Sequence, residues 1–470
     1  MTAQWLSGQT RSGKTAWLID QLLSLAADLG GEPTRGRALL VFAANGDNRI
    51  RLAERITVAT EARYPVVTTT PAGFIESEIT LFWPLLAQSL NLSAQFPLKL
   101  RPENEQELAT RLWQDRLNAG TMAVQGWLPA QTVRRALDFL QLAASDGIPA
   151  EDLPTLLQQG IPPGFAPAEV WQSIGEAVLE WQSWCLNQGL VTYGLMTELY
   201  WRHLLPQPMY RKKLVERYCA VLGDDLDEYP GVARQWFEVF LDQGLPAAFT
   251  WHDYGKVRLG VGADPQALEA LRSRCQETAQ PYPGEDSLAY AWADPVLAGV
   301  QDPLAVPEVP AQMQTLQATS RGEILRLTAE TVADAIEQGQ VQPSEVAIIA
   351  PGLDAIARYT LAEILISRGI AVESLNDQRP LISSPLIRAL LTLLALVYPG
   401  LGRLVDGDAI AEMLVVLSQD PQPQEEVPWY ERIRIDPVRA ELIADHCFEP
   451  DIDTPKLLPV ERFPRWDRLG

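Results

Sequence analysis

The chain has 470 residues, 47% of them hydrophobic and 21% charged, which is the composition of a folded protein too long for a single core. Its formal net charge of −22 argues against a protein that simply coats nucleic acid, because phosphate contacts need clustered Lys and Arg. No apolar run approaches the ~20 residues of a membrane span. Four scattered cysteines and three histidines disfavour a zinc or iron–sulfur site. We expect a cytoplasmic protein without a membrane partner.

A phosphate-binding loop is predicted near the N-terminus. Residues 8–15 fit the pattern G-x-x-x-x-G-K-[ST] without a mismatch, between a short apolar segment at 3–6 and a predicted helix from 16. The glycines allow backbone angles that a Cβ would forbid, so N–H groups can surround a phosphate at the start of the helix. Lys14 is expected to reach the β- and γ-phosphates, and Thr15 to bind Mg²⁺. The predicted nucleotide-binding residues are Gly8, Gln9, Thr10, Arg11, Ser12, Gly13, Lys14 and Thr15.

Strands and helices alternate behind this loop. Apolar runs at 38–43 and 64–70 predict strands, and the segments 48–56 and 73–90 predict helices. This alternation indicates an α/β fold, in which helices flank a parallel sheet.

The pattern changes at about residue 96, where helical periodicity begins to dominate. Helices are predicted at 105–117, 133–144 and 170–188, which indicates an all-helical insertion over 96–217. The α/β pattern then returns, with strands at 219–223 and 247–250 around a helix at 232–241.

A Pro-rich, irregular stretch at 281–312 predicts a linker. A second α/β region is expected over 313–470. Its predicted elements are helices at 321–337, 354–368 and 384–398 and a buried strand at 345–350, followed by a helical tail.

Two aspartates directly follow the predicted strand at 219–223. Phosphoryl transfer needs a carboxylate near Mg²⁺ and a base that orients water, and such residues normally end a strand beside the phosphate loop. Asp224 would hold Mg²⁺ through water, and Asp225 would be the base. The alternative is an acidic helix N-terminus, where the helix dipole favours carboxylates. The loop upstream favours the catalytic interpretation.

The order of these segments resembles the superfamily 1 DNA helicases of the UvrD/PcrA type and the related AddB subunits of bacterial recombination nucleases. The matching segments are 8–15 for motif I, 41–56 for motif Ia, 70–74 for motif Ib, 223–228 for motif II and 262–264 for the end of motif III. The resemblance implies ATP as the nucleotide, single-stranded DNA as a partner, and a nuclease or recombinase as a possible protein partner.

The resemblance also implies a domain organisation. It predicts a first RecA-like P-loop domain over 1–95 and 218–280, with the helical insertion at 96–217 inside it. A partial second RecA-like domain with a helical tail would follow the linker, over 313–470.

Several positions depart from the helicase pattern. The family's catalytic Glu is Asp225, and its motif II Gln is Asp227. The motif III Gln falls on Gly255 and the motif III Arg on Val261, and motifs V and VI are absent. A shorter base can be misplaced by about an ångström, which costs around a hundredfold in rate. The chain is therefore either a fragment of a longer helicase-like protein or a degenerate relative that retains nucleotide binding.

We expect an ATP-binding protein of DNA recombination and repair with weak or partner-dependent ATPase activity. Phe74 could stack on a base, and Asn45, Asn48, Arg49 and Arg51 could contact phosphates; the alternatives are a strand end and a surface helix face. The tryptophans are expected mostly in the core. The rival functions are a non-enzymatic scaffold for a partner nuclease and, less well supported, a small-molecule kinase.

Overall fold

The computed structural model divides the chain into two compact units, Met1–Tyr290 and Ala291–Gly470, which are described separately. It describes residues 3–9, 12–28, 37–92, 96–161, 164–253, 255–279, 288–302, 304, 314–350, 353–373, 384–398, 405–418, 435–451 and 454–459. No helix in these ranges combines the length and the apolar character needed to cross a membrane.

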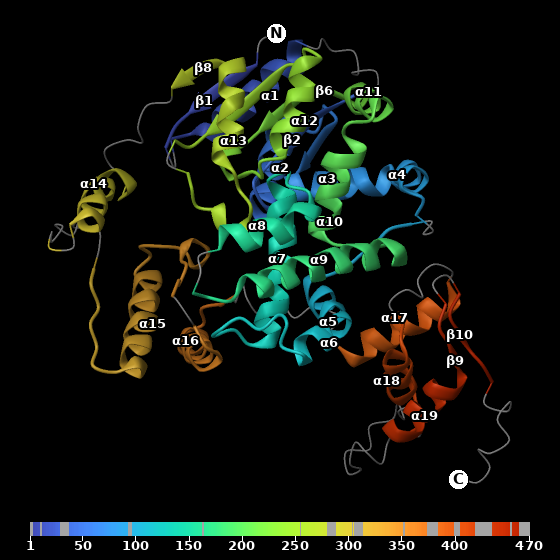
Figure 1. Ribbon diagram of the computed structural model, residues 1–470. Coiled ribbons are helices and arrows are strands. Elements are labelled where there is room, and N and C mark those ends of the chain that lie inside the picture. The colour runs from blue at the N-terminus through green and yellow to red at the C-terminus, as the bar shows by residue number, and fades with distance from the viewer. Residues whose placement is uncertain are drawn as a thin grey trace. The chain divides into compact units, whose positions relative to one another are not determined.

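The first unit is built on a six-stranded sheet whose neighbouring strands are all parallel, in the order β3-β2-β6-β7-β1-β8. The strands are β1 (Gln4–Ser7), β2 (Ala38–Phe42), β3 (Val66–Thr69), β6 (Tyr218–Gly223), β7 (Ala247–Trp251) and β8 (Gln276–Ala279). Strands were predicted at β2, β3, β6 and β7, and β1 lies on the apolar segment noted at 3–6. Because β7 lies between β1 and β6, the segments that follow these three strands meet at one edge of the sheet (Figure 1).

Helices cover both faces of this sheet (Figure 1). Helices α1 (Lys14–Asp28) and α2 (Gly46–Thr60) bury Leu18 and Leu52 against one face, where they meet Leu39 and Val41 of β2. The alternate β2 residues Leu40 and Phe42 face the opposite core, because successive strand side chains point to opposite sides.

That opposite core is rich in aromatic residues. It is covered by α3 (Pro71–Leu81), α4 (Trp83–Leu90), α12 (Ala233–Asp242) and α13 (Pro265–Glu269). Helix α3 begins at its N-cap Thr70, whose side chain accepts a hydrogen bond from the Gly73 N–H at 3.0 Å. The single helix predicted at 73–90 is divided at Phe82, the residue that separates α3 from α4.

Between β3 and β6 the chain forms a mostly helical region, as expected. Its elements are α5 (Pro102–Leu112), α6 (Gln114–Asn118), α7 (Pro129–Ser145), α8 (Leu153–Gly160), α9 (Ala168–Gln188), α10 (Tyr193–Glu198), the π-helical turn η2 (Leu199–Leu204) and α11 (Pro208–Arg217). The region is not entirely helical, because β4 (Leu98–Lys99) pairs with β5 (Leu190–Val191). Trp113 and Trp181 are buried here, which confirms a core role for these tryptophans.

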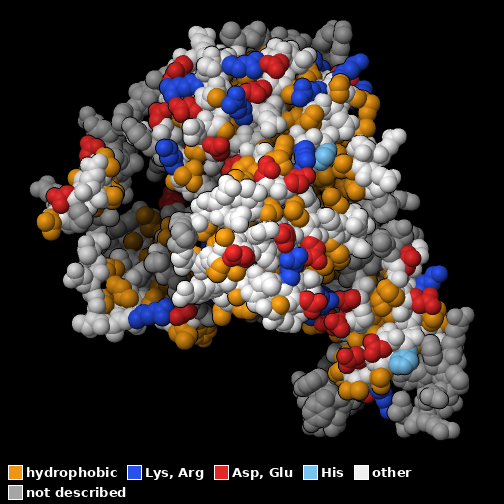
Figure 2. Space-filling view, viewed as in Figure 1, with side chains coloured by type: hydrophobic (Ala, Val, Ile, Leu, Met, Phe, Trp, Pro, Cys, Tyr) orange, Lys and Arg blue, Asp and Glu red, His pale blue; other side chains and the backbone are white. Residues whose placement is uncertain are grey.

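Charged side chains of both signs are interspersed on the face of the first unit in Figure 2, and the described Lys and Arg form no continuous basic stripe there. The run Arg211, Lys212 and Lys213 lies exposed on α11.

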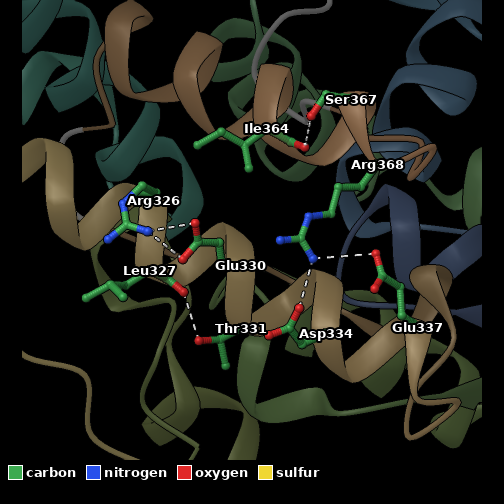
Figure 3. Close-up of polar contacts among 9 residues, drawn as sticks. All are labelled: Arg326, Leu327, Glu330, Thr331, Asp334, Glu337, Ile364, Ser367 and Arg368. Carbon is green, nitrogen blue, oxygen red and sulfur yellow. Dashed lines mark hydrogen bonds and ion pairs between the residues drawn. The ribbon is translucent and has the colours of Figure 1, made fainter.

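The second unit is mostly helical in its described parts. Helices α15 (Arg321–Glu337) and α16 (Ala355–Ser367) share a small core around Ala329, Ala333 and Leu361. Arg368 reaches across to Asp334 and Glu337, as Figure 3 shows. Such exposed ion pairs stabilise little, so the apolar contacts carry most of this packing. A separate group contains α17 (Pro385–Val397), α18 (Gly407–Leu417), α19 (Pro437–Cys447) and the pair β9 (Phe448–Glu449) and β10 (Lys456–Leu457).

One sequence prediction is wrong in this region. The strand expected at 345–350 does not form: Glu345 ends a 3₁₀ turn, 346–350 has no regular structure, and Ile349 is 91% exposed. An apolar run becomes a strand only beside a pairing partner, and the described residues of this unit offer it none. The linker at 281–312 is not irregular throughout, because α14 (Leu288–Gln301) is rich in the helix formers Ala and Leu.

Candidate nucleotide-binding site

The described residues of the segment between β1 and α1 pack closely around Lys14. The Lys14 side chain is only 7% exposed and folds back, so that Nζ donates hydrogen bonds to the carbonyl oxygens of Gly8 and Gln9, both at 3.2 Å. Gly13 has a φ of +89°, a conformation that favours glycine, which explains its place in the motif. The Gly8 N–H donates to the Trp251 carbonyl at 3.0 Å, which fastens the loop to the end of β7.

Ser12 lies just before the start of α1. The Ser12 N–H donates to the Gln9 carbonyl at 3.2 Å, and the buried Ser12 hydroxyl has no hydrogen-bond partner in the described part of the chain. The predicted binding residues Thr10 and Arg11 lie outside the described residues.

Asp224 lies directly against this loop, at the end of β6. Its Oδ2 accepts a hydrogen bond from the Thr15 hydroxyl at 2.9 Å, and its Oδ1 accepts one from the Thr250 hydroxyl at 2.7 Å. Its backbone N–H donates to the Phe42 carbonyl at 3.0 Å, which holds the residue beside β2. The structure therefore brings together the predicted metal-binding pair, Thr15 and Asp224.

Asp225 adopts a left-handed backbone conformation, with φ 54° and ψ 61°. This region is unusual for a residue with a Cβ, and such residues concentrate at functional sites. The Asp225 N–H donates to Thr250 Oγ1 at 2.7 Å, and its Oδ1 lies 3.4 Å from Lys14 Nζ. The predicted base is therefore the counter-ion of the loop lysine in this structure.

Burial and like charge dominate the electrostatics. Burial, together with the charge of Asp225, raises the pKa of Asp224 to about 6, against the lowering effects of Thr250, Thr15 and Lys14. Burial also raises the pKa of Asp227 to about 7 and raises that of Glu228. An added cation would favour the ionised form of these carboxyl groups.

The residues suit a metal ion that keeps much of its hydration shell. Among the described residues, no three His, Cys, Asp or Glu side chains are arranged to hold a metal. Thr15 would supply one oxygen ligand of the kind that Mg²⁺ accepts, and Asp224 would hold the ion through water, because Mg²⁺ usually keeps several waters and binds substrate phosphates. The pair therefore fits Mg²⁺ bound together with a nucleotide.

Two positions that depart from the helicase pattern lie in contact. Asp227 is 2% exposed, and its Oδ1 accepts a hydrogen bond from the His252 N–H at 2.9 Å. A Cβ at Gly255 would lie 1.9 Å from Asp227 Oδ2. The Asp227 carboxylate therefore occupies the volume that a longer residue at 255 would need. Val261, a third such position, is exposed.

The prediction that Phe74 stacks on a base is wrong. Phe74 is 2% exposed and packs edge-on against Phe42 and Tyr200, with ring centroids 5.1 and 5.9 Å away. Phe74 lies one helical turn after the N-cap Thr70, and its ring points into the core of the first unit. Asn45 is the N-cap of α2, where its side chain accepts from the Asn48 N–H at 3.0 Å.

A shallow hollow of about 580 Å³ lies at the carboxyl end of β3 and was not anticipated from the sequence. Its lining residues are Arg49, Thr68, Thr69, Thr70, Gly73, Glu76, Ser77, Thr80 and Leu81. Thr250 was also missed, although a polar residue near the end of the apolar strand at 247–251 was a signal that could have found it.

No protein-family model matches this chain, and no curated protein matches it. The interpretation of the site therefore depends on its geometry.

Proposed function

We propose that the chain binds ATP with Mg²⁺ at the loop 8–15, as a UvrD-like DNA helicase or AddB-like protein of DNA recombination and repair, with weak or partner-dependent ATPase activity. The observation that carries the proposal is the hydrogen bond between Thr15 and Asp224, residues 209 positions apart, beside the buried Lys14. The finer assignments, a RecA-like P-loop domain and a partial second one, belong to the same proposal.

Each residue has a defined part in binding. On nucleotide binding, the Lys14 ammonium group leaves Asp225 and contacts the β- and γ-phosphates. The N–H groups at the start of α1 face the same phosphates. Thr15, and Asp224 through water, would hold Mg²⁺, which would neutralise charge on the phosphate oxygens. Asp225 is the nearest candidate to orient water, once Lys14 has turned to the nucleotide.

Weak hydrolysis is proposed because the water-orienting group is poorly placed. Asp225 has a shorter side chain than Glu and is engaged with Lys14 at 3.4 Å. Asp227 is buried and accepts the His252 N–H, so neither of its oxygens is open to a nucleotide.

DNA contact is proposed for the hollow at the end of β3. Thr68, Thr69 and Thr70 offer hydroxyl groups there, and the Arg49 guanidinium has no ion-pair partner among the described residues. Hydroxyl and guanidinium groups are the side chains that contact phosphates of single-stranded DNA. Arg49→Ala should weaken DNA binding without changing nucleotide affinity.

Calorimetry with ATP and ADP in the presence of Mg²⁺ tests the site. Lys14→Ala should abolish binding, whereas the matched substitution Lys212→Ala, at a side chain that is 76% exposed, should leave it unchanged. Binding that survives Lys14→Ala, or no binding by the unchanged chain, would contradict the assignment.

A second candidate is a non-enzymatic, helicase-like scaffold that supports a partner nuclease or recombinase. It is favoured by the contact between Asp227 and Gly255, which removes the polar motif III side chain from the site. ATP hydrolysis measured with and without single-stranded DNA separates the two. DNA-stimulated turnover that Asp224→Ala abolishes supports the enzyme; no turnover, with recovery of a nuclease in a pull-down, supports the scaffold.

A further inference from the structure

We infer that Thr250 is a positioning residue of the nucleotide site, whose single hydroxyl orients the Asp224 carboxylate and holds the Asp225 backbone. The inference rests on the proposed function. Thr250 is 0% exposed and lies on β7, the strand between β1 and β6.

The sheet register brings Thr250 to this place. Gly223 of β6 pairs with Phe249 of β7, so the next residues along the two parallel strands, Asp224 and Thr250, lie side by side. The phosphate loop is attached to the same strand, because the Gly8 N–H donates to the Trp251 carbonyl. Strand β7 therefore contacts both the phosphate loop, through Trp251, and the two aspartates, through Thr250.

The Thr250 hydroxyl makes two hydrogen bonds, as the acceptor in one and the donor in the other. The Asp225 N–H can only donate, so Thr250 Oγ1 accepts it at 2.7 Å. The hydroxyl proton then points to Asp224 Oδ1, also at 2.7 Å. Thr15 donates to the other oxygen, Oδ2, at 2.9 Å, so two hydroxyl groups from different elements fix the plane of the Asp224 carboxylate.

The same hydroxyl stabilises the unusual backbone of Asp225. At φ 54° and ψ 61° this residue needs support from its surroundings, and a buried N–H without a partner would add to the strain. By accepting the Asp225 N–H, Thr250 keeps that carboxylate directed at Lys14 while it orients Asp224. A residue of the same shape without a hydroxyl would lose both effects.

Thr250→Val and Thr250→Ser separate the hydroxyl from the shape of the side chain. Binding of a non-hydrolysable ATP analogue to the full chain is measured by calorimetry across a Mg²⁺ titration and in EDTA. We expect Thr250→Val to raise the half-saturating Mg²⁺ concentration at least tenfold, as for other residues that orient a metal ligand. The affinity in EDTA should change less than twofold, and Thr250→Ser should restore most of the Mg²⁺ response.

Thr132→Val is the matched control, because Thr132 is also buried but lies on α7. Normal Mg²⁺ dependence in Thr250→Val would overturn the inference, and so would an equal loss of binding with and without Mg²⁺, which indicates a merely structural role. Failure of the unchanged chain to bind the analogue would instead contradict the proposed function. If Thr250→Val does not fold, Thr250→Ser alone is tested, at unchanged thermal stability. A Mg²⁺ requirement equal to that of the unchanged chain then supports the inference. A tenfold higher requirement overturns it.

Discussion

The Asp227 carboxylate lies where a side chain at position 255 would begin: an ideal Cβ on Gly255 would be 1.9 Å from Asp227 Oδ2 and 2.8 Å from its Cγ. The other oxygen of Asp227 accepts the His252 N–H, so the carboxylate cannot turn away without losing that bond. Positions 227 and 255 are therefore structurally coupled, and a glutamine at 255 could not be accommodated without removing Asp227.

Gly255→Ala should destabilise the first unit by about 1–3 kcal/mol, because the added Cβ displaces the Asp227 carboxylate and breaks its hydrogen bond with the part-buried His252 N–H. Urea unfolding followed by tryptophan fluorescence measures the change. The double variant Gly255→Ala, Asp227→Ala should lose less stability than the sum of the losses of the two single variants, because the clash is gone. Gly260→Ala is the control, since its Cβ would enter open space. Equal effects of the two glycine substitutions would contradict the contact.

Gly175→Ala should destabilise the helical region by about 3 kcal/mol or more. A Cβ at Gly175 of α9 would lie 2.4 Å from the Cα of Pro154 in α8, and backbone atoms cannot move aside without separating the helices. The control is Gly160→Ala, at the end of α8, where nothing lies within 4 Å of the added Cβ. The thermal unfolding midpoint should fall in the first variant alone; an unchanged midpoint would show that α8 and α9 are packed less closely.

The pH dependence of stability should contain a contribution from Glu105 of α5. Burial raises its pKa to about 7, although Arg134 and a hydrogen bond with Thr192 lower it. Between its ordinary pKa of 4.5 and about 7, the folded chain holds a proton that the unfolded chain has released. The stability from this proton is therefore complete below pH 4.5 and is lost as the pH rises through 7.

Glu105→Gln should remove this loss. At about 1.4 kcal/mol per pH unit, we expect it to raise the free energy of unfolding by about 3 kcal/mol at pH 8 and to have little effect near pH 4. Urea unfolding across this pH range provides the measurement. Glu107→Gln, on the exposed side of the same helix, should show no such pH dependence. A gain of equal size at both pH values would contradict the assignment to Glu105.

Arg217→Met should destabilise the first unit by about 3–5 kcal/mol. Glu78 of α3 is buried and accepts hydrogen bonds from Arg217 Nη1 at 2.9 Å and from the Tyr210 hydroxyl at 2.8 Å. Removing the guanidinium leaves a buried carboxylate without its counter-ion. Adding Glu78→Gln should recover much of the loss in chemical denaturation. Arg63→Met, which breaks an exposed pair with Glu61, should cost less than 1 kcal/mol. Similar costs for both substitutions would show that Glu78 is well hydrated.

Local patterns were sufficient for much of the first unit. The apolar runs that became β2, β6 and β7 are bounded by turn residues, and the helical stripes of α7 and α9 repeat over several turns. Edge strand β8 was missed because Gln-Glu-Thr-Ala has no apolar pattern. The run at 345–350 has such a pattern but forms no strand, because strand formation depends on a neighbour that the local sequence does not specify.

The loop 8–15 could be proposed as a nucleotide site from the sequence because the motif lies in eight consecutive residues, and the aspartates could be proposed because they end an apolar strand. The rest of the site depends on which strands adjoin. Thr250 contacts Asp224 only because β7 pairs with β6, and Asp227 excludes a side chain at Gly255 only because the two segments fold together. Phe74 is buried because α3 packs on the sheet. Contacts between distant segments form through burial and strand pairing across the whole unit, which no short stretch of residues encodes.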